Sequence, residues 1–323
     1  MEMNDTRLGQ ENRGIFHSIY LTESIITIVF NFLALAVFHQ KTFRLKKSNY
    51  FLTSLTIADL LTGLTLMSKS INFYAAFTTP GILLFIEFAN DVAISGSLFS
   101  LTLIALERVY AVVFPLKHRL LRAKHYSVCI AITWLFAFLF DIPVLLNSWQ
   151  VQLFASNSRN YNVLVTVKMV AGIVALMSIM ISYLVIWIKL TFPDNLHIGR
   201  VHQTTAKMTQ TLFIVTLVSY FCFSPILIGI ICKLWFDASI VVFYPYLVAL
   251  TYVNSFINFI VYALRIPEFR KTLCKILTRY GIRITKAHPI DNFLSALPST
   301  LDGGQPVLIN MKQVKEGGIT KPH

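Results

Sequence analysis

The sequence predicts an all-α membrane protein: a seven-transmembrane helix bundle with a short eighth amphipathic helix on the cytoplasmic side. Three observations lead to this fold class. Hydrophobic residues make up 55% of the 323 residues and charged residues only 13%, about half the charged share of a soluble domain. Seven apolar stretches are each long enough to cross a hydrocarbon core of roughly 30 Å as a helix. Basic residues gather in the segments between and after these stretches.

The predicted spans follow one another through short connections, which favours neighbouring antiparallel helices. They lie near residues 18–39, 50–73, 82–113, 126–148, 161–189, 208–232 and 241–263. A basic amphipathic stretch, PEFRKTLCKILTRYG, follows the last span. We therefore expect an extracellular N-terminus (1–17), a seven-transmembrane bundle (18–263), a juxtamembrane helix (264–280) and a flexible cytoplasmic tail (281–323).

The distribution of Lys and Arg predicts the orientation of the bundle. Of the 28 basic residues, 21 fall in segments 40–49, 114–125, 189–207 and 264–323, whereas only four fall on the opposite side. Since cytoplasmic loops carry the excess of basic residues, we expect a plasma-membrane protein with its N-terminus outside and its C-terminus in the cytosol. Most of the basic residues behind the net charge of +13 then face anionic lipid and a cytosolic partner. The net charge therefore does not indicate nucleic-acid binding.

Two residues match patterns for covalent modification. Asn4-Asp5-Thr6 fits the glycosylation acceptor pattern on the side predicted to be extracellular. Cys274 lies on the basic juxtamembrane stretch and is either a palmitoylation site or an ordinary residue of the apolar helix face. The four Cys residues show no metal-ligand spacing, and we expect no disulfide. We find no nucleophile–base pair or phosphate loop and expect no enzyme.

Polar residues at mid-depth in the spans are candidates for function, because a charge at the bilayer centre costs at least about 2.5–3.5 kcal/mol. They come from helices far apart in the sequence: Asn31, Asp59, Ser97, Asn254, Ser255 and Asn258. Oxygen donors around one carboxylate suit a small hard cation such as sodium. The alternative is a network of interhelical hydrogen bonds around a protonated Asp59.

Glu107 and Arg108 lie near the cytoplasmic end of the third span. A neighbouring Glu can hold an Arg at a helix end and later release it to a partner protein. The alternative is an Arg that only extends its charged end to the membrane surface.

The outer half of the bundle contains charges of both signs, at Glu23, Lys69, Glu87, Asn90, Asp91, Asp141 and Lys168. One helical turn is about 3.6 residues, so Glu87, Asn90 and Asp91 share a face that Lys69 could bridge across two helices. We predict a polar or zwitterionic ligand, a small molecule or peptide, at Lys69, Glu87, Asn90, Asp91 and Lys168. The alternative is a structural salt bridge that touches no ligand.

The chain resembles a rhodopsin-like (class A) G-protein-coupled receptor from about residue 20 to 280. Six motifs of that family follow in order: Asn31, Asp59 in LTIADLL, Glu107-Arg108-Val109 with Pro115-Leu116, Trp134, Cys222-Phe223-Ser224-Pro225, and Asn258-Phe259-Ile260-Val261-Tyr262. A short extracellular loop and the missing family cysteines resemble the branch that holds melanocortin, cannabinoid and lysophospholipid receptors. Adenosine receptors are more distant relatives of that branch.

This resemblance implies roles for individual residues. Asp59, Ser97, Asn254, Ser255 and Asn258 match the family's allosteric sodium pocket. The residues implied in activation and G-protein coupling are Glu107, Arg108, Leu116, Tyr183, Phe223, Pro225, Asn258 and Tyr262. Arg108 is the pivot and Glu107 its resting partner, while Leu116 packs into the G protein. Pro225 kinks the sixth span, whose outward movement opens the cytoplasmic cavity.

The departures from the family pattern leave alternatives open. Phe223 stands where the family has Trp, and Phe259 stands where it has Pro. The chain is expected to bind an extracellular ligand and activate a heterotrimeric G protein, with arrestin and membrane lipids as further partners and no cofactor besides the sodium ion. One alternative is a receptor-like protein that couples weakly. Another is a secondary transporter or ion channel, which should show paired acids along a path and an internal repeat.

Overall fold

The computed structural model describes residues 2–44, 47, 49–75, 79–154, 159–191, 199–236 and 243–279. Side chains are described for 14–41, 43, 47, 49–75, 79–143, 145–146, 163–189, 191, 213–232 and 243–279. Residues 1–276 form one compact unit and residues 277–323 a second. The predicted flexible tail, 281–323, lies outside the described residues, and so does the side chain of Asn4.

Every element in the described ranges is a helix. In chain order these helices are α1 (Glu2–Phe38), α2 (Lys41–Arg44), α3 (Asn49–Ala75), α4 (Pro80–Val113), α5 (Pro115–Leu120), α6 (Ala123–Phe154), α7 (Arg159–Thr191), α8 (Gly199–Phe236), α9 (Tyr244–Arg265) and α10 (Pro267–Arg279). Seven of them contain a stretch long and apolar enough to cross a membrane: α1, α3, α4, α6, α7, α8 and α9. The predicted fold class, seven spans followed by a short eighth helix, is therefore confirmed.

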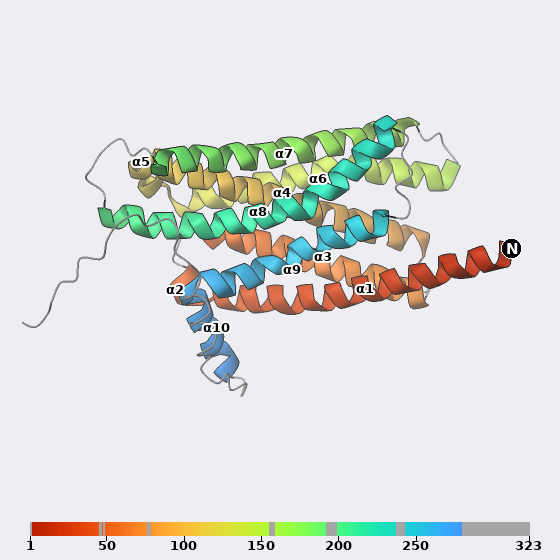
Figure 1. Ribbon diagram of the computed structural model, residues 1–323, viewed down its shortest axis with the longest axis horizontal. Helices are drawn as coiled ribbons and strands as arrows, with labels where there is room; N and C mark the ends of the chain where they lie inside the picture. The colour runs from red at the N-terminus through yellow and green to blue at the C-terminus, as the bar shows by residue number, and fades with distance from the viewer. Residues whose placement is uncertain are drawn as a thin grey trace, which may run out of the picture. The chain divides into compact units, whose positions relative to one another are not determined.

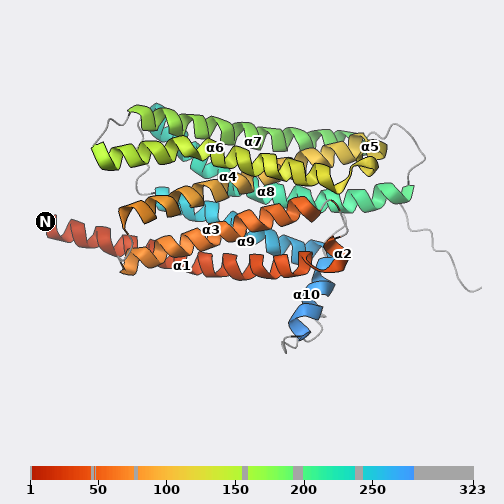
Figure 2. The same ribbon diagram turned by 180° about the vertical axis from the view of Figure 1, so that it is seen from behind.

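The seven long helices run side by side along one axis (Figures 1 and 2). Helix α4 contacts α3, α6, α7 and α8, so it lies inside the bundle. The short helix α5 lies at one end of the bundle, and the N-terminus of α1 lies at the other (Figure 1). These two ends are called the α5 end and the opposite end below.

Proline residues set several helix boundaries. Pro80 occupies the first turn of α4, and Pro115 begins α5 directly after the non-helical Phe114. Proline lacks the amide hydrogen that a helix interior needs and disfavours a helical residue before it. Pro225 lies inside α8, where the ring removes one backbone hydrogen bond. The helix therefore lacks one backbone hydrogen bond at this point.

The first helix is longer than the first apolar span. Helix α1 begins at Glu2, although the apolar stretch was predicted to begin near residue 18. The separate N-terminal segment 1–17 expected from the sequence is therefore helical from residue 2 onward. Hydropathy locates the part of a helix that can lie in lipid, and the described residues Gly14–Phe38 of α1 contain such a part. It does not limit a helix that continues through polar residues.

The outward-facing surface of the bundle is apolar, whereas its interior is closely packed. Large side chains such as Phe32, Phe85 and Trp187 are more than half exposed, which suits a surface in contact with lipid. Inside, Gly63 of α3 lies against α1, where an added Cβ would come within 3.0 Å of Thr27 and Ile28. Small residues of this kind let two membrane helices approach closely.

An aromatic cluster joins the base of α10 to the bundle. The ring of Phe269 lies 5.5 Å from that of Phe38, 5.8 Å from Phe259 and 5.9 Å from Tyr262. Phe269 and Leu273, one turn apart, are the buried residues of α10. The helix is therefore amphipathic, and the predicted juxtamembrane helix is confirmed between Pro267 and Arg279.

Candidate functional site

A buried polar centre surrounds Asp59, which is 0% exposed on α3. Ser97 Oγ of α4 donates a hydrogen bond to Asp59 Oδ1 at 2.8 Å, and Asn258 Nδ2 of α9 donates one to Asp59 Oδ2 at 2.9 Å. The carboxylate is thus held by two helices that lie far from it in the sequence. No basic residue in the described part of the chain forms an ion pair with it.

The other polar residues predicted for this centre are also buried. Asn31 Nδ2 of α1 donates to the Ser255 carbonyl oxygen at 2.7 Å, which ties α1 to α9. Asn254 is also buried, and neither its Oδ1 nor its Nδ2 has a hydrogen-bond partner among the described residues. The Asn258 Oδ1 atom is likewise buried without a partner. Oxygen atoms of this kind remain available to a ligand.

A second cluster lies toward the α5 end, around Glu107 of α4. Arg108 Nη2 pairs with Glu107 Oε2 at 2.6 Å, and His118 Nε2 of α5 lies 2.7 Å from Glu107 Oε1. The hydroxyl of Tyr126 in α6 lies 3.1 Å from His118 Nε2. Glu107 and Arg108 are both buried. The structure therefore brings together the Glu–Arg pair that the sequence predicted, and it adds a histidine to it.

Other residues with implied activation roles differ in exposure. Leu116 of α5 is 76% exposed, which leaves it open to a partner. Tyr183 of α7 and Tyr262 of α9 are buried, and the Tyr262 hydroxyl has no hydrogen-bond partner among the described residues. A buried hydroxyl without a partner costs roughly 1–3 kcal/mol.

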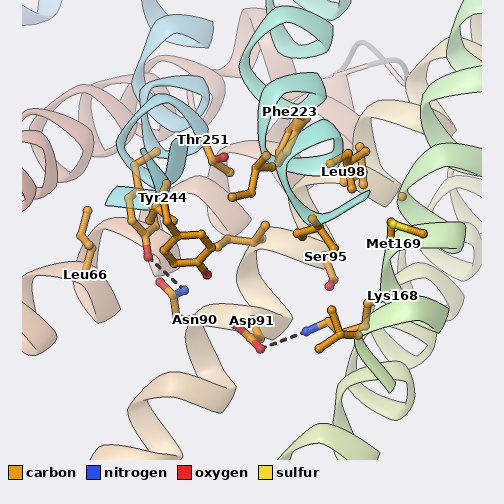
Figure 3. Close-up of a pocket in the computed structure, with 18 of the residues that line it drawn as sticks. Leu66, Asn90, Asp91, Ser95, Leu98, Lys168, Met169, Phe223, Tyr244 and Thr251 are labelled. Carbon is orange, nitrogen blue, oxygen red and sulfur yellow. Dashed lines mark hydrogen bonds and ion pairs between the residues drawn. The ribbon is translucent and has the colours of Figure 1, made fainter. Parts of the chain in front are cut away.

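A cavity of ≈ 730 Å³ opens in the half of the bundle away from α5. Residues from all seven long helices line it, and its polar groups include Lys69, Asn90, Asp91 and Lys168. Figure 3 shows Asn90 and Asp91 on α4, with Lys168 reaching Asp91 from α7. Phe223 of α8 also lines the cavity. A volume of this size suits a small organic molecule or a short peptide.

A charge cluster borders this cavity and joins three helices. Lys168 Nζ of α7 lies 2.9 Å from Asp91 Oδ2 of α4 and 2.7 Å from Asp141 Oδ1 of α6. The Asp141 side chain is 0% exposed, whereas the Asp91 side chain is 37% exposed. Lys168 is therefore held between one buried acid and one acid that faces the cavity.

Two features of the outer half differ from the arrangements considered in the sequence analysis. The structural alternative, an ion pair of Lys69 with Glu87 or Asp91, is not found among the described residues, where Asp91 pairs with Lys168. Glu87 is exposed and does not line the cavity, although it lies one turn from Asn90. Helical spacing predicts that Glu87, Asn90 and Asp91 lie near one another. It does not predict that Lys168 of α7, and not Lys69, forms the ion pair with Asp91.

The contact of His118 with Glu107 was not predicted from the sequence. The eight His residues are scattered along the chain, and only the turn at Pro115 brings this one back onto Glu107. Also not predicted was the hydrogen bond that Trp134 Nε1 of α6 donates to Ser54 Oγ of α3 at 3.0 Å. The four cysteines form no disulfide.

The comparisons with known proteins agree with this architecture. The family model described as 7 transmembrane receptor (rhodopsin family) matches residues 30–262, which is most of the chain. The chain therefore belongs to this family and is a multi-pass membrane protein. Because the family and the relatives below are receptors, the expectation that the chain is not an enzyme is confirmed.

Several curated proteins resemble the chain. The neuropeptide S receptor of Rattus norvegicus is 31% identical over 149 residues, which is 43% of this chain and 40% of that receptor. The muscarinic acetylcholine receptor M5 of Macaca mulatta is 32% identical over 39% of this chain and 24% of its own length. The adenosine receptor A2b of Gallus gallus is 28% identical over 72% of this chain and 79% of its own. The chain thus spans less than half of the first relatives it matches.

Proposed function

We propose that this chain is a plasma-membrane G-protein-coupled receptor, with the N-terminus of α1 outside and α5 and α10 facing the cytosol. The ligand would occupy the ≈ 730 Å³ cavity, and a heterotrimeric G protein would bind at the α5 end. Membership in the receptor family supports this proposal. The seven spans also show no internal repeat in the sequence, which disfavours the transporter alternative. The relatives are named for a neuropeptide, acetylcholine and adenosine, ligands too diverse to indicate one for this chain.

The observation that carries the proposal is that α4 passes through all three polar regions. It supplies Asp91 to the cavity, Ser97 to the polar centre and Arg108 to the cluster at the α5 end. A shift of this helix would change all three sites together. Such a shared element is what coupling between a ligand and a distant partner requires.

In the proposed mechanism, the Glu107–Arg108 ion pair maintains the resting state. Opening of the pair would free the guanidinium of Arg108 for the G protein, while the exposed Leu116 would pack against it. The weakened backbone at Pro225 would let α8 swing outward. Tyr262, whose buried hydroxyl has no partner among the described residues, would gain one in the active arrangement.

The experiment is to express the chain with reporters for each class of G protein and to measure nucleotide exchange without added ligand. Arg108→Ala should reduce the signal to background, because the neutral side chain cannot meet the partner. Arg279→Ala, an exposed arginine at the end of α10, is the matched control and should retain the signal.

Two outcomes would contradict the proposal. Equal signalling by Arg108→Ala and the unchanged chain would exclude the role of Arg108. No signal above untransfected cells with any G-protein class would favour the receptor-like protein that couples weakly, which Phe223 in place of the family's Trp also supports.

We also propose that the polar centre binds a sodium ion, with Asp59, Ser97, Asn254, Ser255 and Asn258 as the residues that would hold it. Three observations support the fit. The single carboxylate has no basic partner among the described residues, a hydroxyl oxygen contacts it, and the side-chain oxygens of Asn254 and Asn258 are buried without partners. Carboxylate, hydroxyl and amide oxygens are hard donors that suit a small cation.

The test compares the thermal stability of the purified chain in sodium chloride and in choline chloride at equal ionic strength. A bound ion stabilises the folded state in proportion to the logarithm of its concentration, so sodium should raise Tm. Asp59→Asn should abolish this increase, whereas Asp91→Asn, which changes an acid outside the centre, should preserve it. An equal sodium effect in Asp59→Asn would exclude the site.

A further inference from the structure

The charged side chains that line the cavity are not equally available to a ligand. Lys168 contacts both Asp91 and Asp141, at 2.9 Å and 2.7 Å. A ligand acid at Lys168 would therefore have to approach two carboxylates. A ligand amine at Asp91 would compete with an ammonium group that is already in place. These three residues are therefore already engaged in ion pairs with one another.

The neutral polar side chains of the cavity wall are also engaged. Asn90 Oδ1 accepts a hydrogen bond from Thr65 at 3.0 Å, and Asn90 Nδ2 donates to the Tyr252 hydroxyl at 3.3 Å. The hydroxyl of Tyr20 donates to the carbonyl oxygen of Pro245 at 3.0 Å. The wall around Lys69 is thus composed of groups that already have partners.

Lys69 differs from all of these residues. Lys69 lines the cavity, and it forms no ion pair within 4.0 Å in the described part of the chain, although Asp91 and Glu87 act on it from farther away. Its side chain is only partly exposed. Removing a charged group from water without giving it a partner costs free energy, so an anion placed beside Lys69 would relieve that cost.

The remaining cavity wall is largely apolar. Leucine, isoleucine and phenylalanine side chains from four helices form it, among them Leu98, Phe99, Phe140, Phe223, Ile226 and Leu227. An apolar body that fills this space would gain free energy in proportion to the area it buries.

Resting on the proposed function, we infer that the ligand class is a singly charged carboxylate with an apolar or aromatic body, whose carboxylate binds Lys69. Lys168, Asp91 and Asp141 together carry one net negative charge, and Asp91 and Glu87 act on Lys69 from beyond ion-pair distance, so a ligand with one negative charge at Lys69 is repelled less than a ligand with two. A phosphate group carries up to two negative charges at neutral pH, and the second charge would add to the repulsion from Asp91 and Glu87, which both act on Lys69. The charge of the cavity therefore favours a carboxylate over a phosphate.

The test uses three compounds that share one apolar body and differ in the head group: 6-phenylhexanoate, 6-phenylhexanamide and 6-phenylhexylamine. Binding to the purified full-length chain is measured from the rise in Tm with compound concentration. The unchanged chain should prefer the acid to the amide by about tenfold or more, since an ionic hydrogen bond is being compared with a neutral one.

Variants of Lys69 separate the charge from the shape of the cavity. Lys69→Met keeps the length of the side chain and should remove the preference for the acid. Lys69→Arg keeps the charge and should retain the preference. Lys69→Glu should reverse it in favour of the amine. The Tm of each variant without compound shows that it is folded.

Equal affinity of the acid for the unchanged chain and for Lys69→Met would overturn the inference, as would preference of the unchanged chain for the amine. Failure of all three compounds to bind would overturn it as well. None of these results bears on the basal signalling test with Arg108→Ala, so failure of the ligand class and failure of receptor function are distinguishable.

Discussion

The two ion-pair clusters of the bundle are built in opposite ways. At the α5 end, Glu107 and Arg108 are neighbours on α4, and His118 follows eleven residues later. Beside the cavity, Lys168 joins Asp91, 77 residues away in the sequence, to Asp141 on a third helix. One cluster is local in the chain, whereas the other exists only because three helices pack together.

This difference predicts what happens when each cluster opens. Breaking the Glu107–Arg108 pair separates groups on one helix, so the bundle can stay assembled while Arg108 turns away. Breaking the Lys168 cluster removes the polar link between α4, α6 and α7 and leaves the fully buried Asp141 without its cation. The local cluster is therefore suited to switching, and the long-range cluster to holding the bundle together.

The largest effect is expected for Lys168→Met. Removing one partner of a buried ion pair leaves an unpaired charge and typically costs at least about 3 kcal/mol. We expect this loss of stability, seen as a lower Tm of the purified chain in detergent. Lys69→Met is the matched control, because Lys69 forms no ion pair with the described residues and its removal should cost much less.

A double variant tests whether the cost of Lys168→Met arises from the stranded acid. Asp141→Asn in the Lys168→Met background removes the unpaired charge, so it should recover part of the lost stability. If the double variant is as unstable as the sum of the two single variants, the residues are not coupled. The long-range cluster would then have no part in holding α6 and α7 together.

The sequence was sufficient for the features that depend on local pattern or on family motifs. Apolar length identified all seven spans, and the adjacency of Glu107 and Arg108 indicated their ion pair. Mid-depth position grouped Asp59 with Ser97 and Asn258, which the structure joins by hydrogen bonds. Polar groups in the membrane interior must find one another, so depth alone restricts their partners.

The contacts of long, flexible side chains could not be predicted in the same way. Lys69 and Lys168 both lie in the outer half of the bundle, and either could have reached Asp91. The choice depends on the rotation of α3 and α7 about their axes, which a span of nearly uniform hydropathy does not define. The relation of His118 to Glu107 was equally hidden, since it depends on the turn of α5 after Pro115.

A smaller effect is expected for His118→Phe, which tests the local cluster. His118 and Arg108 contact different oxygens of Glu107, so the histidine orients the carboxylate and does not compete with the arginine. Loss of a hydrogen bond to a charged group costs roughly 1.5 kcal/mol at a partly exposed site. That would shift the equilibrium toward released Arg108 by about tenfold and raise basal nucleotide exchange.

The matched control is His125→Phe, since His125 is exposed and, within the described residues, its ring is hydrogen-bonded to the backbone of Arg122. It should leave basal exchange unchanged at equal expression. A rise of equal size in both variants would mean that the loop as a whole restrains activity. Unchanged basal exchange in His118→Phe would mean that Glu107 holds Arg108 without help from α5, and the switching role would then belong to the Glu107–Arg108 pair of α4 alone.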